Sequence, residues 1–288
     1  MKKQILLFCC LFLLIMSCKV QQPIRENSIK IERKLPQQKG SVSVLKREFI
    51  IKGLNEVSHK IYIYLPPNYS TTKEKYSVIY MQDAQNLFDV KTAFAAEWEV
   101  DETLDSLYHK TGKGFIIVGV ENGGEKRIEE YTPWKNEKYG GGKGEIYIDF
   151  LVNELKPYID RNYKTKKSAK DTAIIGSSLG GLISFYGGLK YPNVFGKIGA
   201  LSTSFWFSNK VNEFAEKNGN QKKTKLYLLI GDKEGASMVA DTENMAERLL
   251  DIGFPKKNIK TKVAPNGKHT ESFWKREFLE VITYLYNL

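Results

Sequence analysis

The stretch Thr172-Ala173-Ile174-Ile175-Gly176-Ser177-Ser178-Leu179-Gly180-Gly181 joins an apolar run, a Gly-Ser-Ser-Leu-Gly turn and the start of a helical pattern. This order of strand, glycine-flanked serine and helix is typical of a nucleophile elbow, a strained turn that presents a serine hydroxyl. The strand and the helix approach closely there, so the residues two before and two after the serine must be small. Gly176 and Gly180 meet this condition for Ser178, whereas isoleucine and leucine flank the neighbouring serine. The motif therefore predicts Ser178 as the nucleophile.

Around the elbow, short β-rich runs alternate with amphipathic helical patterns. The first two predicted strands are expected to pair antiparallel, and the later alternation predicts an α/β fold with a mostly parallel sheet and helices on both faces. Ligand sites in such folds lie in loops after the carboxyl ends of the strands. The predicted strands are Leu45–Lys52, His59–Leu65, Ser77–Met81, Phe115–Val120, Thr172–Ile175, Lys197–Leu201, Leu226–Ile230 and Ile259–Val263, and the predicted helices are Ala95–His109, Ile146–Arg161, Leu179–Tyr191, Val239–Leu250 and Glu271–Tyr286.

A serine hydroxyl needs a base to take its proton, and the usual base is a histidine oriented by a carboxylate. The chain has three histidines. His269 follows the last predicted strand in a glycine-bearing loop, which is where a fold with this elbow delivers its base. His59 is expected at a surface position of an early strand, and His109 at the end of a helix, where a cation favours the helix dipole. We therefore expect His269 to be the base.

The acid is expected between Ser178 and His269, because the chain order in this arrangement is serine, acid, histidine. It should lie at the end of the predicted strand Leu226–Ile230, which runs into Gly231-Asp232-Lys233-Glu234-Gly235. Asp232 and Glu234 both qualify by position, and composition does not choose between them.

From about Ser58 to Leu288 the chain resembles the putative esterase (esterase D-like) family of α/β-hydrolases, which includes feruloyl and acetyl carbohydrate esterases, siderophore esterases and mycolyl transferases. The resemblance implies an α/β-hydrolase fold and a serine esterase that uses Ser178 and His269. In family members the acid is typically the fourth residue of a Gly-x-x-Asp/Glu turn, which implies Glu234, with Asp232 as the alternative. The matching stretches are Val78–Asp89, Gly119–Gly123, the elbow with Gly181-Leu182, Tyr191–Phe195, Leu201-Ser202, Gly231–Gly235 and His269–Trp274.

The resemblance also implies an oxyanion hole made of two backbone N–H groups. Leu179, directly after the nucleophile, would supply one, and Gln85 in the loop after an early strand would supply the other. The chain departs from the family pattern at Gln82 and Ala84, where many relatives carry His and Gly, but backbone donors tolerate side-chain changes. The expected reaction is ester hydrolysis through an acyl-enzyme, and it requires no metal and no cofactor.

Two aromatic segments leave the carboxyl ends of predicted strands and are candidates to line the substrate cleft. They carry Trp134 and Trp206, which could stack on a sugar or a feruloyl ring; packing inside the protein is the competing interpretation. Trp98 and Trp274 lie in helical patterns and are expected in the core. The substrates predicted first are acetyl or feruloyl esters of carbohydrates. The alternatives are a siderophore (enterochelin-type) ester, or no reaction at all in an envelope-tethered binding module of the same fold.

The N-terminal residues predict export. Lys2 and Lys3 precede the apolar run Ile5–Met16, and a small residue then precedes Cys18, a pattern that resembles a bacterial lipoprotein signal. The resemblance implies removal of residues 1–17, a lipid on Cys18, and attachment to a membrane of the bacterial cell envelope at its periplasmic or surface face. An ordinary secretory signal or a short anchor helix is the alternative. The polar residues 18–40 predict a tether, and residues 41–288 one esterase domain.

The amino-acid composition excludes several other classes of protein and of binding site. The 288 residues are 42% hydrophobic and 27% charged, which excludes disordered and collagen-like chains. All three cysteines lie in the first 18 residues, so the folded domain has neither disulfides nor a zinc site built on cysteine. The net charge of +11 affects association but comes without a nucleic-acid motif. The expected partners are therefore a small-molecule or glycan ester and a membrane, and not nucleic acid.

Overall fold

The computed structural model describes residues 38–54 and 58–288. Cys18, the expected signal segment 1–17 and the expected tether up to residue 37 lie outside the described residues, so the lipid anchor stays a prediction. The end of that tether is packed, because the backbone N–H of Gly40 donates to Asp105 Oδ1 at 2.8 Å. Within residues 38–54 and 58–288, no helix has both the length and the apolar character of a membrane span.

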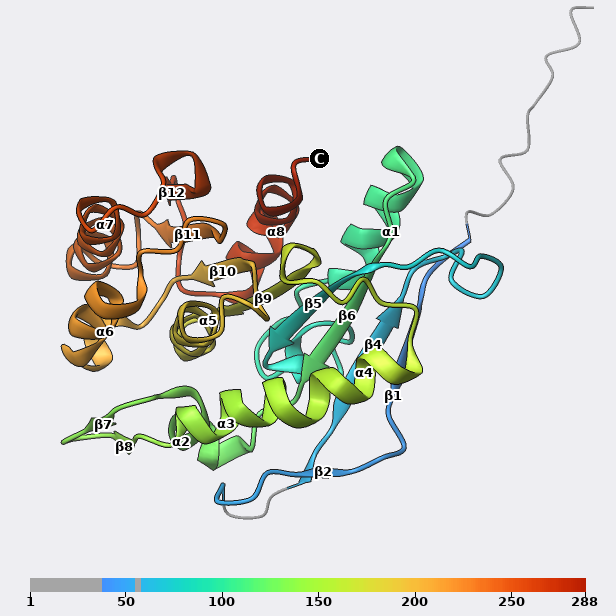
Figure 1. The fold of residues 1–288 in the computed structure, drawn as a ribbon, viewed down its shortest axis with the longest axis horizontal. Helices are drawn as coiled ribbons and strands as arrows, with labels where there is room; N and C mark the ends of the chain where they lie inside the picture. The colour runs from blue at the N-terminus through green and yellow to red at the C-terminus, as the bar shows by residue number, and fades with distance from the viewer. Residues whose placement is uncertain (1–37, 55–57) are drawn as a thin grey trace, which may run out of the picture. The chain divides into compact units, whose positions relative to one another are not determined.

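Eight strands form one sheet in the order β1-β4-β6-β5-β9-β10-β11-β12 (Figure 1). Strand β4 runs antiparallel to both of its neighbours, whereas each neighbouring pair from β6 to β12 is parallel. The predicted mostly parallel sheet with an antiparallel N-terminal edge is therefore confirmed. The strands of this sheet are β1 (Ser41–Val44), β4 (Ile61–Leu65), β5 (Ser77–Gln82), β6 (Phe115–Val120), β9 (Thr172–Ser177), β10 (Lys197–Leu201), β11 (Lys225–Gly231) and β12 (Ile259–Ala264). Two small pairs lie outside it: β2 (Phe49–Ile50) with β3 (Ser58–His59), and β7 (Lys135–Asn136) with β8 (Gly140–Gly141).

Helices cover both faces of the sheet, and each face has its own apolar core. One face carries α1 (Val100–Thr111) and α8 (Glu271–Tyr286). The other carries α3 (Gly144–Phe150), α4 (Lys156–Asn162), α5 (Leu179–Lys190), α6 (Lys210–Asn218) and α7 (Ala236–Asp251). Alternation along β9 serves both cores, because Ile174 joins one and Ile175 joins the other. The short helices are α2 (Arg127–Tyr131), the π-helical η3 (Leu151–Leu155) and the 3₁₀ turns η1 (Ala84–Asn86), η2 (Gly124–Lys126), η4 (Ala169–Asp171), η5 (Phe205–Phe207) and η6 (Lys256–Asn258).

Two predicted elements differ from the structure. The strand prediction at Leu45–Lys52 is wrong for most of its length, because β1 begins at Ser41 and only Phe49–Ile50 are extended in β2. The apolar side chains there serve the core instead: Phe49 and Ile51 are buried, and Phe49 packs against the rings of Phe150 and Tyr158 at 5.7 and 5.5 Å. The helix predicted from Ala95 begins only at Val100. Backbone bonds from Trp98 and Val100 to the carbonyls of Asn86 and Leu87 tie the residues before it to the loop after β5.

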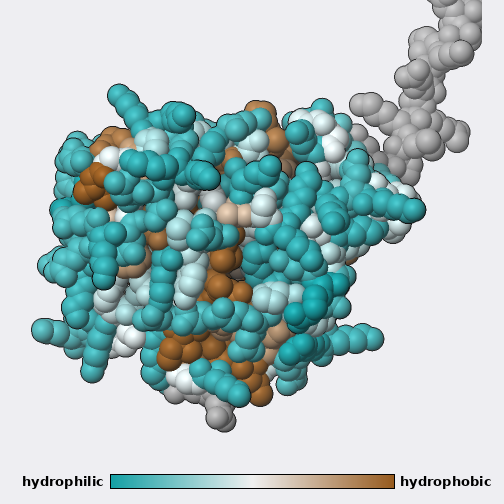
Figure 2. Space-filling model, in the orientation of Figure 1, coloured by the Kyte–Doolittle hydropathy of each residue, from teal (hydrophilic) through white to brown (hydrophobic). Residues whose placement is uncertain are grey.

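The surface is largely hydrophilic on the face that Figure 2 draws, and apolar side chains form several smaller patches on it. The carboxyl ends of β9 to β12 lie along one edge of the sheet, and their loops are bonded to one another. Ser178 N donates to Leu201 O at 2.9 Å, and Ser202 N donates to Leu229 O at 2.7 Å. Asp232 N donates to the Ala264 carbonyl at 3.1 Å in the same way. The sheet thereby places the loops that carry the predicted serine, acid and histidine side by side.

Candidate active site

The elbow has the geometry that its glycines predict. Ser178 connects β9 to α5 with φ 58° and ψ −124°, a left-handed conformation that is strained for a residue with a side chain. A Cβ added to Gly176 would lie 2.4 Å from the carbonyl oxygen of Gly180, and one added to Gly180 would lie 3.1 Å from Asp83 Oδ2. Neither glycine has room for a side chain without moving its neighbours. The predicted strand, turn and helix are confirmed, and they hold Ser178 at the carboxyl edge of the sheet.

His269 and Glu234 are brought together across the ends of β11 and β12. His269 Nδ1 lies 2.6 Å from Glu234 Oε2, and the Glu234 side chain is fully buried. Glu234 Oε1 accepts two more hydrogen bonds, from the Gly231 N–H at 2.9 Å and from the Ser202 hydroxyl at 2.6 Å. Asp232, the other predicted acid, is 37% exposed and has Lys233 Nζ at 3.9 Å. Of the two carboxylates, Glu234 is the one that contacts the imidazole.

The nucleophile and the imidazole are not hydrogen-bonded to each other. The Ser178 hydroxyl lies 3.4 Å from the Ser204 hydroxyl, which is long for such a bond. Among the described residues it has no hydrogen bond with His269. Catalytic hydrogen bonds are often long in the free enzyme and shorten when substrate binds. The structure therefore brings two of the three predicted side chains into contact and places the third at the same edge of the sheet, on the loop after β9, with the loop after β10 in between.

The two predicted oxyanion donors lie on elements that touch. Leu179 is the first residue of α5, where backbone N–H groups have no partner inside the helix. Gln85 lies in η1, and its side-chain oxygen accepts the Asn122 N–H at 3.4 Å. The loop of η1 contacts the elbow, since a Cβ on Gly180 would meet Oδ2 of Asp83, the residue just before η1, at 3.1 Å. This arrangement is compatible with backbone donors from both segments.

A partly buried ion pair that the sequence did not predict holds the η1 loop. Asp83, just before η1, has a left-handed φ of 56° and is 8% exposed. The Arg127 guanidinium donates two hydrogen bonds to the Asp83 carboxylate, from Nε to Oδ1 at 2.7 Å and from Nη2 to Oδ2 at 2.8 Å. Asn122 Nδ2 adds a bond to Oδ1 at 2.6 Å. The available sequence signal was only that Asp83 and Asn122 both follow carboxyl ends of strands.

Removing the two hydrogen bonds from Arg127 to Asp83 should make the loop that carries Gln85 less ordered. We expect Arg127→Ala to lower kcat for p-nitrophenyl acetate by about 10²-fold, the cost of losing one oxyanion donor, with KM little changed. Arg127→Lys keeps the charge but not the paired hydrogen bonds, so its loss of kcat should be smaller. Arg248→Ala is the matched control, because Arg248 pairs with Glu216 near the surface. Steady-state kinetics and thermal melting of all three variants check this, and an unchanged kcat in Arg127→Ala would contradict it.

The expected surface position of His59 is wrong. His59 is 1% exposed, and its Nε2 lies 2.9 Å from Oε1 of Glu130, a side chain that is itself fully buried. The other oxygen of Glu130 accepts the Gly123 N–H at 2.9 Å. Glu130 lies in helix α2 and His59 in β3, and the pairing offsets the cost of burying both polar groups. His109 lies in the last turn of α1, as predicted.

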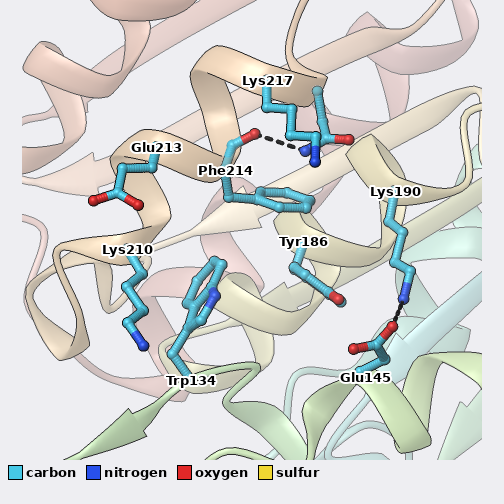
Figure 3. Close-up of a pocket in the computed structure, with 9 residues that line it drawn as sticks. Trp134, Glu145, Tyr186, Lys190, Lys210, Glu213, Phe214 and Lys217 are labelled. Atoms are coloured by element: carbon cyan, nitrogen blue, oxygen red, sulfur yellow. Dashed lines mark hydrogen bonds and ion pairs between the residues drawn. The ribbon is translucent and has the colours of Figure 1, made fainter.

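The two candidate cleft tryptophans lie in different surroundings. Trp134 packs edge-on against Tyr186 and Phe214, both at 5.6 Å, and lines a cavity of about 380 Å³ (Figure 3). None of Ser178, Glu234 and His269 lines that cavity. Tyr186 lies eight residues beyond Ser178 on α5, about 12 Å along the helix axis. The structure therefore places the Trp134 ring in a packed aromatic cluster farther along α5, in a cavity that the three predicted catalytic side chains do not line.

Trp206 is the exposed aromatic side chain close to the nucleophile. It lies in η5, two residues after Ser204, and is 47% exposed. Its ring is edge-on to the Tyr139 ring at 5.8 Å, and Tyr139 is 45% exposed. Trp98 and Trp274 are 3% and 5% exposed, which confirms their predicted place in the core.

One group of carboxylates in the described part of the chain has the geometry to hold a metal ion. The ligand oxygens of Glu97, Asp101 and Glu102 lie within 4.8 Å of one another. Burial and the neighbouring Glu102 raise the pKa of Asp101 to about 7. A proton on Asp101 relieves part of the repulsion at neutral pH, so the cluster needs no ion to exist.

Comparison with known proteins agrees with the geometry. A family model described as "Putative esterase" matches residues 55–285. The uncharacterized protein YbbA of Bacillus subtilis is 28% identical over 238 residues, which cover 78% of this chain and 91% of YbbA. An endo-1,4-beta-xylanase/feruloyl esterase of Xylanibacter ruminicola is 25% identical over 74% of this chain and 27% of that protein. The siderophore hydrolase EstA from Aspergillus nidulans superposes with a TM-score of 0.69 at 17% identity, over 93% of this chain and 98% of EstA. The predicted α/β-hydrolase fold is confirmed.

Proposed function

Since this chain belongs to the putative esterase family of carboxylic ester hydrolases, we propose that it is a serine esterase with Ser178, His269 and Glu234 as its catalytic triad. The observation that carries the proposal is the 2.6 Å contact between His269 Nδ1 and the buried Glu234 carboxylate. The strained Ser178 lies at the same edge of the sheet. A buried carboxylate on Nδ1 leaves the opposite ring nitrogen, Nε2, to act as the base.

The proposed reaction is acyl transfer to water in two steps. The Ser178 oxygen attacks the ester carbonyl while His269 Nε2 takes its proton, and the backbone N–H groups of Leu179 and Gln85 stabilise the oxyanion. His269 then gives the proton to the leaving alcohol. A water molecule, deprotonated by His269, then attacks the acyl carbonyl, and His269 returns the proton to the Ser178 oxygen as the acid leaves. Glu234 holds the ring in the working tautomer and stabilises its cationic form.

The proposed substrates are acyl esters of carbohydrates, with a feruloyl or acetyl group. Support comes from the exposed Trp206 ring, which contacts the exposed Tyr139 ring and lies two residues after Ser204, the residue whose hydroxyl faces Ser178. Flat aromatic surfaces stack on hydroxycinnamoyl rings and on sugar faces. The Xylanibacter relative, whose name pairs a xylanase with a feruloyl esterase, adds to this support.

Substitution of Trp206 tests this substrate class. We expect Trp206→Ala to raise KM for methyl ferulate about fivefold, because an aromatic pair contributes about 1 kcal/mol beyond burial. The KM for p-nitrophenyl acetate should change less than about twofold, since an acetyl group has no ring to stack. Trp134→Ala is the matched control, because Trp134 lines the separate cavity. Equal effects on both esters would contradict the stacking role, and a wild-type protein that hydrolyses no ester would contradict the function.

A siderophore ester is the second candidate. The likeness to the siderophore hydrolase EstA favours it, and the net charge of +11 suits an anionic catecholate substrate. Faster turnover of a tri-catechol lactone, ferric or iron-free, than of methyl ferulate and acetylated sugars would select this candidate over the carbohydrate ester.

A further inference from the structure

We propose that Ser202 and Trp274 are positioning residues, which hold the Glu234 carboxylate and, through it, the His269 ring in the orientation that catalysis needs. This inference rests on the proposed triad. Three contacts form a continuous chain. Trp274 Nε1 lies 2.7 Å from Ser202 Oγ, Ser202 Oγ lies 2.6 Å from Glu234 Oε1, and Glu234 Oε2 lies 2.6 Å from His269 Nδ1.

The chemistry of the donors fixes the direction of this chain. An indole N–H can only donate, so the Ser202 oxygen must accept the bond from Trp274. The single hydroxyl proton of Ser202 is then free to point at Glu234, whose carboxylate accepts the hydrogen bond. Glu234 Oε1 thus receives two bonds, from Ser202 and from the Gly231 N–H, and Oε2 faces His269. With Oε1 occupied in this way, the carboxylate cannot rotate without breaking a buried hydrogen bond.

The backbone of Ser202 indicates that the hydroxyl matters at this position. Ser202 has a φ of 46° and is fully buried, and its N–H is bonded to the Leu229 carbonyl at 2.7 Å. A left-handed residue with a side chain carries strain that persists only where its surroundings hold it. Glycine would adopt this φ at lower cost but would supply no hydroxyl for Glu234.

Trp274 contacts the acid–imidazole pair at both ends. Its N–H reaches Glu234 through Ser202, and its ring packs edge-on against the His269 ring, with centroids 5.1 Å apart and an interplanar angle of 84°. The indole is held in turn by Trp98, at 5.7 Å in the core beneath α8. Helix α8 therefore supplies a rigid support for a histidine that lies on a loop.

Three variants test separately the Ser202 hydroxyl, the Ser202 backbone strain and the Trp274 N–H. Ser202→Ala removes the hydroxyl, Ser202→Gly also relieves the backbone strain, and Trp274→Phe keeps a ring without the N–H. Each should lower kcat for p-nitrophenyl acetate about 10- to 100-fold, the range for losing a hydrogen bond to a charged group. KM should stay within about twofold, because neither side chain is proposed to touch substrate. The double variant Ser202→Ala with Trp274→Phe should lose little more than Ser202→Ala alone, since the two groups act in series.

Two matched controls come from the same chain. Ser77→Ala removes another buried serine that bonds a carboxylate, Asp171 Oδ1 at 3.3 Å, at the opposite end of the strands. Trp134→Phe makes the same change from indole to phenyl at a tryptophan that packs against Tyr186 and Phe214 in the separate aromatic cluster. Both controls should keep kcat. A proton NMR signal far downfield, from the His269 Nδ1 proton shared with Glu234, should move in the three variants and stay in place in the controls.

The outcomes separate this inference from the proposed function. If the wild type hydrolyses esters and the three variants keep both its kcat and its downfield signal, the positioning role is overturned while the triad stands. The role is overturned equally if the control variants lose as much activity as the test variants. If the wild type has no esterase activity, the proposed function fails, and the NMR signal alone then decides whether Ser202 and Trp274 orient the pair.

Discussion

Alanine in place of Ser178 should lower kcat/KM for p-nitrophenyl acetate by about 10⁴- to 10⁶-fold, the loss seen when a triad nucleophile is removed. The same change should abolish covalent labelling by a fluorophosphonate, which reacts with an activated serine. The physical reason is the elbow, because only Ser178 combines the strained turn with a place beside the first N–H groups of α5. Labelling is measured by intact mass, with hydrolysis followed in parallel.

Ser177→Ala is the matched control for this prediction, since Ser177 precedes the nucleophile in the same turn and is 6% exposed. It should still be labelled at one site per chain. Thermal melting should show Ser178→Ala to be at least as stable as the wild type, because active-site strain often opposes stability. If Ser178→Ala were still labelled, or if only Ser177→Ala lost its labelling, the nucleophile would be another serine and the proposed mechanism would be wrong.

The central strands could be predicted from the sequence because they are buried on both faces. β6 and β10 have the predicted bounds, and β9 and β11 differ only at their ends, since a buried parallel strand is a short apolar run between turns. β1 could not be found in this way. All four of its residues are exposed, and its pairing with β4 depends on backbone hydrogen bonds that leave no hydrophobic pattern.

In the candidate site too, the residues with a local sequence signal could be predicted and those without one could not. Ser178 and His269 have local signals, a glycine-flanked turn and a loop after the last strand. The groups that hold the site come from distant parts of the chain: Asp83 meets Arg127, and Ser202 meets Trp274. No spacing rule connects such partners, and for Trp274 the sequence predicted burial but not its hydrogen bond. For the acid, position alone left Asp232 and Glu234 open, and only the family resemblance implied Glu234. In the structure, Lys233 N donates to Gly267 O at 2.9 Å, which ties the acid turn to the loop that carries His269.

Glutamine in place of Glu234 should lower kcat by about 10⁴-fold, as when an amide replaces a triad acid and the histidine takes the wrong tautomer. Asp232→Asn should change kcat by less than about threefold, because an exposed carboxylate beside Lys233 contributes little in water. The two substitutions are chemically matched, each exchanging a carboxylate for an amide within one five-residue turn.

Glu234→Asp adds a second comparison, since it keeps the charge and shortens the side chain by one methylene. It should fall between the wild type and Glu234→Gln, because the shorter carboxylate cannot keep its contacts with Ser202, Gly231 and His269 together. Circular dichroism and thermal melting check that each variant folds. If Asp232→Asn lost more activity than Glu234→Gln, the acid would be Asp232, and the contact between Glu234 and His269 would be structural. In that case the Ser202 and Trp274 chain would orient a residue outside the reaction, and its variants should leave kcat unchanged.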